Sequence, residues 1–130
     1  MGAIGTTSAG MSSLSSISNI VQEGLRMGTK LIGGDEAALN KFAMHLNAQK
    51  TFTQNDQVRL QDVIKQAYPG RASDKVFMDT AQVYTLAKAL ELSYGGHVPS
   101  GNIASMGPFQ KELLSPPIPI DLRSVGLALS

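Results

Sequence analysis

The sequence predicts an all-α protein with a small core of three or four helices and an extended segment at each end. Apolar residues recur at helical spacing in four segments between positions 11 and 94. Capping residues precede three of these segments, and glycine or proline follows the first, third and fourth. The flanking stretches are instead rich in serine, glycine or proline. A length of 130 residues fits a single domain.

We expect the first helix over residues 11–32, ended by the Gly33-Gly34 pair. The opposite face of this helix begins with serines, which are mediocre helix formers, so the helix needs support from packing or from a partner. Gly24 and Gly28 lie one turn apart, a spacing that lets another backbone approach closely. Its apolar stripe comprises Leu14, Ile17, Val21, Leu25, Gly28 and Ile32.

The second and third helices are expected over residues 36–49 and 54–67. Asp35 is in the position of an N-cap for the second helix. Thr53 and Asp56 have the spacing of a capping box at the start of the third, with Asp in place of the usual Glu. Tyr68-Pro69-Gly70 predicts a turn that closes it.

The fourth helix is expected over residues 74–94, capped by Ser73 and stopped by Gly95-Gly96. Apolar residues cover more than half of its circumference, which predicts that it is the central helix of the core.

The chain changes character after Gly96. Residues 97–110 have the glycines and prolines of a loop, a short turn is expected over 110–114, and residues 115–120 are proline-rich and extended. The single domain, 1–130, therefore divides into an N-terminal arm with the first helix (1–34), a helical core (35–96), and a loop with an extended tail (97–130). The large apolar residues of the tail include Ile118, Ile120, Leu122, Val125 and Leu127.

Charge is sparse and unevenly distributed. The net charge is +1, and charged residues make up 16% of the chain, against about 25% in typical soluble domains. The first charged residue is Glu23, and the next after Glu91 is Lys111. A free monomer needs a charged surface to stay soluble. We therefore expect both ends to be covered by other copies or other subunits of an assembly.

The sequence predicts no catalytic residues, no cofactor site and no metal site. Cysteine is absent, and neither His45 nor His97 has acidic or histidine neighbours at metal-ligand spacing. Basic residues of the middle helices alternate with acidic ones, so no nucleic-acid site is expected. Residues 1–6 fit the permissive N-myristoylation pattern at Gly2, but no basic cluster follows to strengthen marginal membrane contact.

These observations favour a non-enzymatic structural subunit of a large assembly. A virion component is the leading interpretation, most of all a capsid-associated, tail or internal protein of a bacteriophage. The serine-rich, uncharged start is also typical of rod or needle subunits and substrates of type III or flagellar secretion, which would reside in the bacterial cytoplasm before export. A third interpretation is a small helical adaptor or regulator. The residues expected at the interface are Leu14, Ile17, Val21, Gly24, Leu25, Gly28, Ile118, Ile120, Leu122, Val125 and Leu127.

Overall fold

The computed structural model describes residues 16–114 and confirms a mostly helical fold. Over this range the chain forms no strand; an isolated bridge joins Ser16 to Asn102. Short 3₁₀ turns follow α2 and α4 and precede α6. The α-helices are α2 (Ile17–Arg26), α3 (Glu36–Gln49), α4 (Gln54–Ala67), α5 (Lys75–Ser93) and α6 (Pro108–Leu114).

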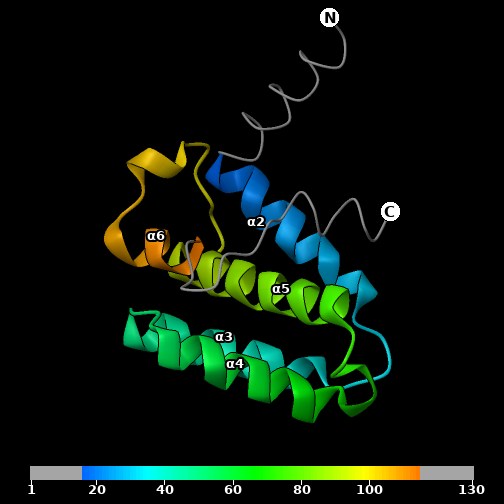
Figure 1. Ribbon diagram of the computed structural model, residues 1–130. Helices are drawn as coiled ribbons and strands as arrows, with labels where there is room; N and C mark the ends of the chain where they lie inside the picture. The colour runs from blue at the N-terminus through cyan, green and yellow to red at the C-terminus, as the bar shows by residue number, and fades with distance from the viewer. Residues whose placement is uncertain (1–15, 115–130) are drawn as a thin grey trace, which may run out of the picture.

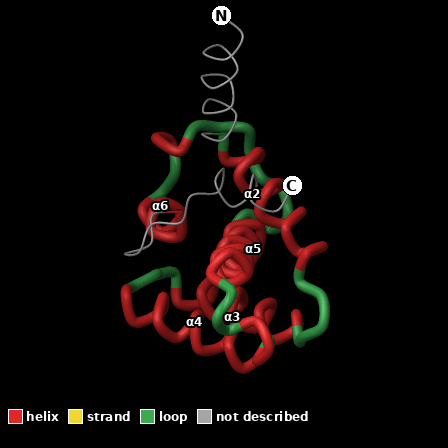
Figure 2. The backbone as a smooth tube through the Cα atoms, turned by 45° about the vertical axis from the view of Figure 1, so that its right-hand side comes forward, coloured by secondary structure: helices red, strands yellow, loops and turns green. Residues whose placement is uncertain are grey.

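The helices are arranged around α5. Helices α3 and α4 form an antiparallel pair on one side of α5, and α2 and α6 lie on the other (Figure 1). Figure 2 shows α5 nearly end-on between these two groups. Each of the five helices contributes buried residues to one continuous core. The predicted central helix is therefore confirmed.

Helix α5 also buries polar residues, and each of them has a hydrogen-bond partner. The hydroxyls of Thr80 and Thr85 each donate to the backbone carbonyl four residues earlier, at 2.7 Å in both cases. The Gln57 side-chain amide of α4 donates to the Gln82 side chain of α5. Because buried polar groups are costly without partners, these bonds allow α5 to be enclosed on nearly all sides.

Helix α2 is shorter than the expected 11–32. It ends at Arg26 and continues as a 3₁₀ turn, Met27–Lys30, after which Leu31 leaves helical geometry. Residues 11–15 lie outside the described part of the chain. Ile17, Ile20 and Val21 are buried, with exposed fractions of 1–3%. The part of the apolar stripe that lies within α2 packs on α5 of the same chain, whereas Ile32, beyond α2, is exposed. The support that we expected this helix to need therefore comes from packing within the chain.

The helix starts follow local hydrogen bonding. The predicted capping box is confirmed: the Thr53 hydroxyl accepts from the Asp56 N–H at 3.3 Å, and the Asp56 carboxylate accepts from the Thr53 N–H at 2.9 Å. The predicted cap of the fourth helix is wrong by one residue. Asp74, not Ser73, accepts from the Phe77 N–H at 3.1 Å. Asp35 occupies the N-cap position of α3 without a side-chain cap bond.

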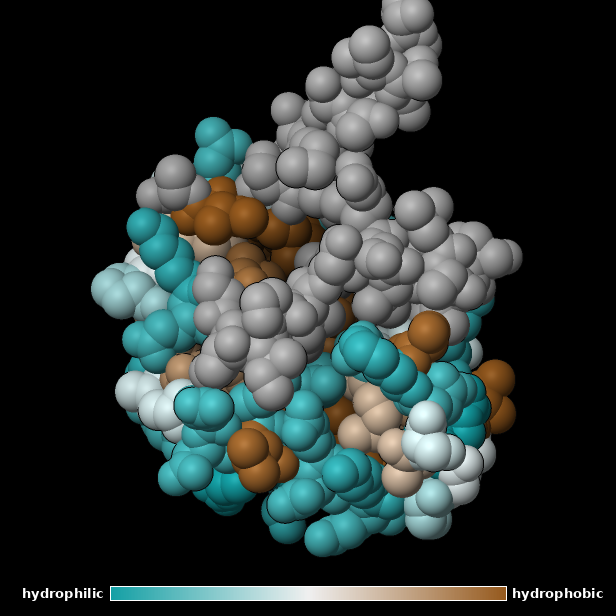
Figure 3. Space-filling view, viewed as in Figure 1, coloured by the Kyte–Doolittle hydropathy of each residue, from teal (hydrophilic) through white to brown (hydrophobic). Residues whose placement is uncertain are grey.

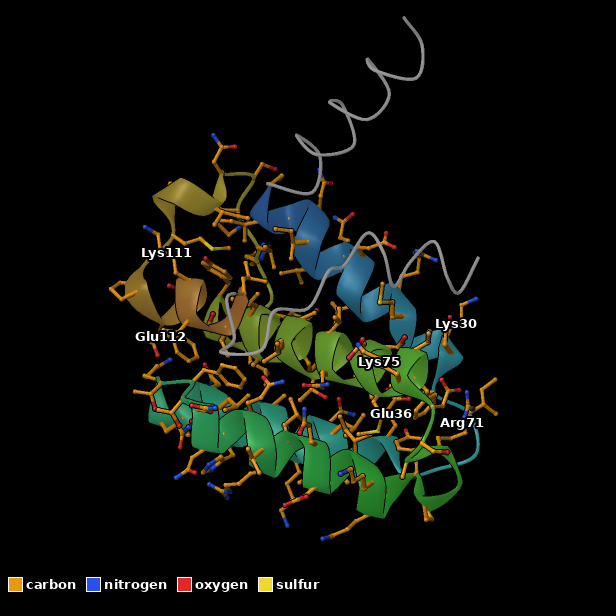
Figure 4. The ribbon with its side chains drawn as sticks, in the orientation of Figure 1. Lys30, Glu36, Arg71, Lys75, Lys111 and Glu112 are labelled. Carbon is orange, nitrogen blue, oxygen red and sulfur yellow. The ribbon has the colours of Figure 1, made fainter. Side chains whose placement is uncertain are left out.

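Residues 97–114 belong to the folded unit, so the core is larger than the expected 35–96. Helix α6, where only a short turn over 110–114 was expected, begins at Pro108 and buries Leu113 completely. Glu112 lies between α6 and the α3–α4 turn, where it accepts from the Phe52 N–H at 3.2 Å (Figure 4). In the loop before α6, the Gly101 carbonyl accepts a hydrogen bond from the Ile17 N–H at 2.7 Å.

Candidate interaction surface

The interface residues expected in the first helix lie mainly inside the fold. Ile17 and Val21 are buried in the core, and Leu25 packs against it while partly exposed. Gly24 and Gly28 provide the close approach that their spacing predicts, but to α5 of the same chain: Gly24 faces Ala87 and Gly28 faces the Tyr84 ring. The other expected interface residues, Leu14, Ile118, Ile120, Leu122, Val125 and Leu127, lie outside the described residues.

A hydrophilic surface covers most of the α3–α4 side seen in Figure 3, with apolar residues scattered singly over it. Ile32, Met44, Val58 and Val76 are the exposed large apolar residues of the described chain. Single exposed aliphatic side chains are normal on soluble proteins. On the α3–α4 side, the exposed apolar residues therefore do not indicate a binding site. A groove and the charged residues that line it are the better indication.

An open groove runs between α3 and α4, and none of its lining residues belongs to α5. We call it the α3–α4 groove; its volume is about 560 Å³. The spacing of three, four and seven residues along each helix brings its lining to one face. Four of its residues come from α3, four from α4 and one from the α3 N-cap. These are Asp35, Ala38, Lys41, Phe42, His45, Arg59, Val63, Gln66 and Ala67.

Small residues keep the groove open at one end. Ala38 of α3 and Ala67 of α4 leave space between the helices, and Val63 contributes a short wall. The backbone Asp35 N–H donates to the Ala67 carbonyl at 3.2 Å, which ties the start of α3 to the end of α4. The groove therefore rests on two helices that are joined at this end by a hydrogen bond and at the other by a four-residue connection, 50–53.

A cationic cluster lies along the groove. The Arg59 guanidinium is 3.5 Å from His45 Nε2 and 5.8 Å from the centre of the Phe42 ring. The His45 and Phe42 rings are 5.6 Å apart, and Lys41 lines the same groove. The Arg59 side chain is 59% exposed, so most of its donors face solvent. Such a cluster can receive a carboxylate or backbone carbonyl groups.

The carboxylate beside Arg59 is already engaged in other hydrogen bonds. Asp56 lies 3.9 Å from Arg59, but its oxygens accept hydrogen bonds from Gln49 Nε2 at 2.8 Å and from the N–H and hydroxyl of Thr53. Burial raises the pKa of Asp56, but these hydrogen bonds and the Arg59 charge outweigh it, so the pKa lies below the usual 3.8. Asp56 thus caps α4 and leaves Arg59 largely available to a partner.

A second polar cluster joins α3 to α5. The Tyr84 hydroxyl lies 2.5 Å from Glu36 Oε2, to which it donates, and 2.9 Å from Asn40 Oδ1. Glu36 lies between α3 and α5 (Figure 4). Burial and the Glu36 carboxylate raise the pKa of Tyr84 far above 10. A tyrosine held neutral in this way fixes the packing of two helices, which is a structural role.

The histidines and acidic residues are the groups to consider for metal binding or acid–base chemistry in the described part of the chain. Among residues 16–114, no group of three or more His, Asp or Glu side chains is placed to hold a metal ion. His45 has a cation and an aromatic ring as neighbours, neither of which orients a histidine as a general base. His97 lies exposed in the loop after Gly96.

Sequence reasoning missed the α3–α4 groove. It treated the basic residues of the middle helices as a solvated, mixed-charge face, and it considered His45 only as a metal ligand, for which Lys41, four residues earlier, is an unfavourable neighbour. The four-residue connection between two amphipathic helices was the available signal, because it forces α3 and α4 to lie side by side.

Comparison with protein families, with curated proteins and with solved structures found no match to this chain. In the described part of the chain, no helix combines the length and the apolar character needed to cross a membrane.

Proposed function

We propose that the chain is a non-enzymatic structural subunit of a large protein assembly. A virion is the assembly that we favour, with the chain as a capsid-associated, tail or internal component, in the first instance of a bacteriophage. The observation that carries the proposal is the contrast between the helical bundle over 17–114 and the two segments that flank it. The bundle has its own core, whereas the flanking segments have the composition of contact arms.

The C-terminal flank carries the stronger support. Residues 115–130 contain six large aliphatic residues and only two charged ones, Asp121 and Arg123. Burial of one aliphatic side chain is worth about 1.5–3 kcal/mol, so a neighbouring subunit that covers several of them gains substantial affinity. Three prolines between 116 and 119 favour an extended segment over a further helix.

The N-terminal contact segment is shorter than the predicted arm and first helix, residues 1–34. Because α2 packs on α5, the segment available for contacts is 1–15. It contains no charged residue and is dominated by glycine, serine, alanine and threonine. Because it has no charged residue, such a segment is not repelled electrostatically by a neighbouring surface. Its small side chains allow it to pack closely against that surface.

Two truncations test the proposal. Deletion of 1–15 or of 115–130 is expected to leave the helical circular dichroism of the bundle intact and to abolish incorporation into the native particle, measured by native mass and component identification. The cut must fall before Ile17, because a deletion of 1–22 would also remove three buried residues of α2.

The outcomes separate the candidate functions. Truncated protein that assembles normally would contradict the assembly role. Loss of the bundle itself on truncation would mean that the flanks pack on their own core, and the adaptor interpretation would then be the better one.

A further inference from the structure

We propose that the α3–α4 groove of one copy binds residues 118–123 of another copy, so that subunits join head to tail. The proposal rests on the assembly role proposed above and names the contact that would carry it. The contact would join the exposed cations of the groove and the single acid at its end to a segment that carries one proline, one acid and one base.

The charges of the two partners are complementary. The groove presents the cations Lys41 and Arg59, with the His45 ring beside Arg59, and it has Asp35 at the start of α3. The segment Ile118-Pro-Ile-Asp121-Leu-Arg123 carries an acid followed two residues later by a base. Asp121 would meet the cationic cluster, and Arg123 would meet Asp35.

The spacing of these charges is compatible with such pairing. Asp35 and Lys41 are separated by about 9 Å along the helix axis, at about 1.5 Å per residue. Two residues of fully extended chain span about 7 Å. The long side chains of Lys41 and Arg123 can cover the difference, because each has several rotatable bonds.

The backbone chemistry of the segment also suits this groove. The groove is lined by helices, whose backbone groups are already hydrogen-bonded, so it can offer only side chains. Pro119 has no N–H, so the segment has one backbone donor fewer to leave unsatisfied on binding. Its carbonyls can accept from Lys41, Arg59 and Gln66. Restricted φ angles also reduce the conformational entropy lost on binding.

Helix α6, the last described helix, lies beside the α3–α4 turn: Glu112 accepts a hydrogen bond from the Phe52 N–H. The segment that follows Leu114 in the sequence can therefore reach the groove within one chain or from another copy. The assembly role proposed above favours another copy, and mixing two variants separates the two cases. A contact of this kind closes into a ring or continues as a filament.

The other flank fits the groove less well. Residues 1–15 carry no charge and would leave Lys41, Arg59 and Asp35 unmatched. The observations therefore favour 118–123 as the occupant.

Charge reversal on the full chain tests the proposal. Arg59→Glu and Asp121→Lys are each expected to weaken association by about tenfold or more, measured by sedimentation over a concentration series. Lys65→Glu is the matched control: it reverses an exposed cation on α4 that does not line the groove, and association should stay within about twofold of wild type. Lys41→Glu repeats the charge reversal at a groove residue on α3, where the new carboxylate does not replace a cation beside Asp56. Circular dichroism verifies that each variant folds.

A mixture of the two variants distinguishes binding between copies from binding within one chain. An equimolar mixture of Arg59→Glu and Asp121→Lys proteins offers a complementary groove for every segment, so association is expected to recover to within about threefold of wild type. Recovery in the double variant but not in the mixture would overturn the head-to-tail arrangement.

The test also separates this proposal from the assembly role. If loss of 115–130 abolishes assembly while Arg59→Glu and Lys41→Glu leave it unchanged, the groove contact is wrong and the assembly role stands. If the wild-type chain stays monomeric and enters no particle, the groove contact and the assembly role are both wrong.

Discussion

Gly24 of α2 lies so close to Ala87 of α5 that a Cβ added to the glycine would be 2.4 Å from the Ala87 Cβ. Real Cβ atoms essentially never approach to this distance, so a side chain at Gly24 would force the helices apart. Gly28, one turn later, faces the Tyr84 ring, and a Cβ there would be 2.7 Å from it. The two glycines therefore set the separation between α2 and the central helix.

Gly24→Ala is expected to destabilise the protein by about 1–2 kcal/mol. Overpacking costs about 1–3 kcal/mol, and the 2.4 Å approach to the Ala87 Cβ places this site in the upper half of that range. The gain of about 1 kcal/mol in helix propensity offsets part of the cost. Urea unfolding measures the change. Gly70→Ala is the matched control, because its added Cβ meets nothing within 4 Å and should change stability by less than about 0.5 kcal/mol. Equal effects of the two substitutions would contradict the close packing of α2 on α5.

Tyr84→Phe is expected to cost about 1–2 kcal/mol at neutral pH, because it removes the hydroxyl that donates to Glu36. The pKa of Tyr84 in the folded protein is raised above the usual 10.0, by burial first and then by Glu36. The stability from neutral Tyr84 is therefore complete below pH 10 and is lost as pH rises above it.

Unfolding free energies measured between pH 9 and 11.5 should fall less steeply for Tyr84→Phe than for wild type. Tyr68 and Tyr94, whose pKa values burial also raises, account for the slope that remains. Parallel slopes in the two proteins would rule out the buried Tyr84–Glu36 contact.

Asp56→Asn is expected to destabilise the protein by about 1 kcal/mol at pH 7, because it weakens the capping box of α4. The folded-state pKa of Asp56 is lowered, so its stabilisation is present above pH 3.8 and is lost as pH falls below that value. The difference from wild type should thus shrink at acid pH. Asp62→Asn, an exposed position on the same helix, should have little effect at any pH. Thermal unfolding over a pH series checks both.

Leu113→Ala is expected to cost about 2–5 kcal/mol, because Leu113 is fully buried where α6 meets the core. Ile32→Ala is the control: Ile32 is 75% exposed, and its truncation should change stability by less than about 0.5 kcal/mol. Chemical denaturation measures both. A small effect of Leu113→Ala would mean that α6 is not part of the cooperative unit.

The sequence predicted those elements that depend on neighbours close in the chain. The bounds of α3 and α4 match the predicted ranges, and those of α5 are within one residue. The Thr53–Asp56 capping box is a hydrogen-bonding arrangement among four consecutive residues, so its residue types were enough to predict it. Helix α6 was underestimated although Pro108 lies at its start, where proline is common. A seven-residue helix is marginal alone, and this one depends on the burial of Leu113.

The tertiary structure alone decided which apolar faces meet. The stripe of α2 was visible in the sequence, but whether another chain or α5 covers it depends on residues more than 50 positions away, such as Val83 and Ala87. The α3–α4 groove has the same origin, since Lys41 and Arg59 line one site only when their helices lie side by side. Periodicity and capping are local and can be determined from sequence, whereas the pairing of surfaces is a competition among all faces of the chain, which only the folded structure resolves.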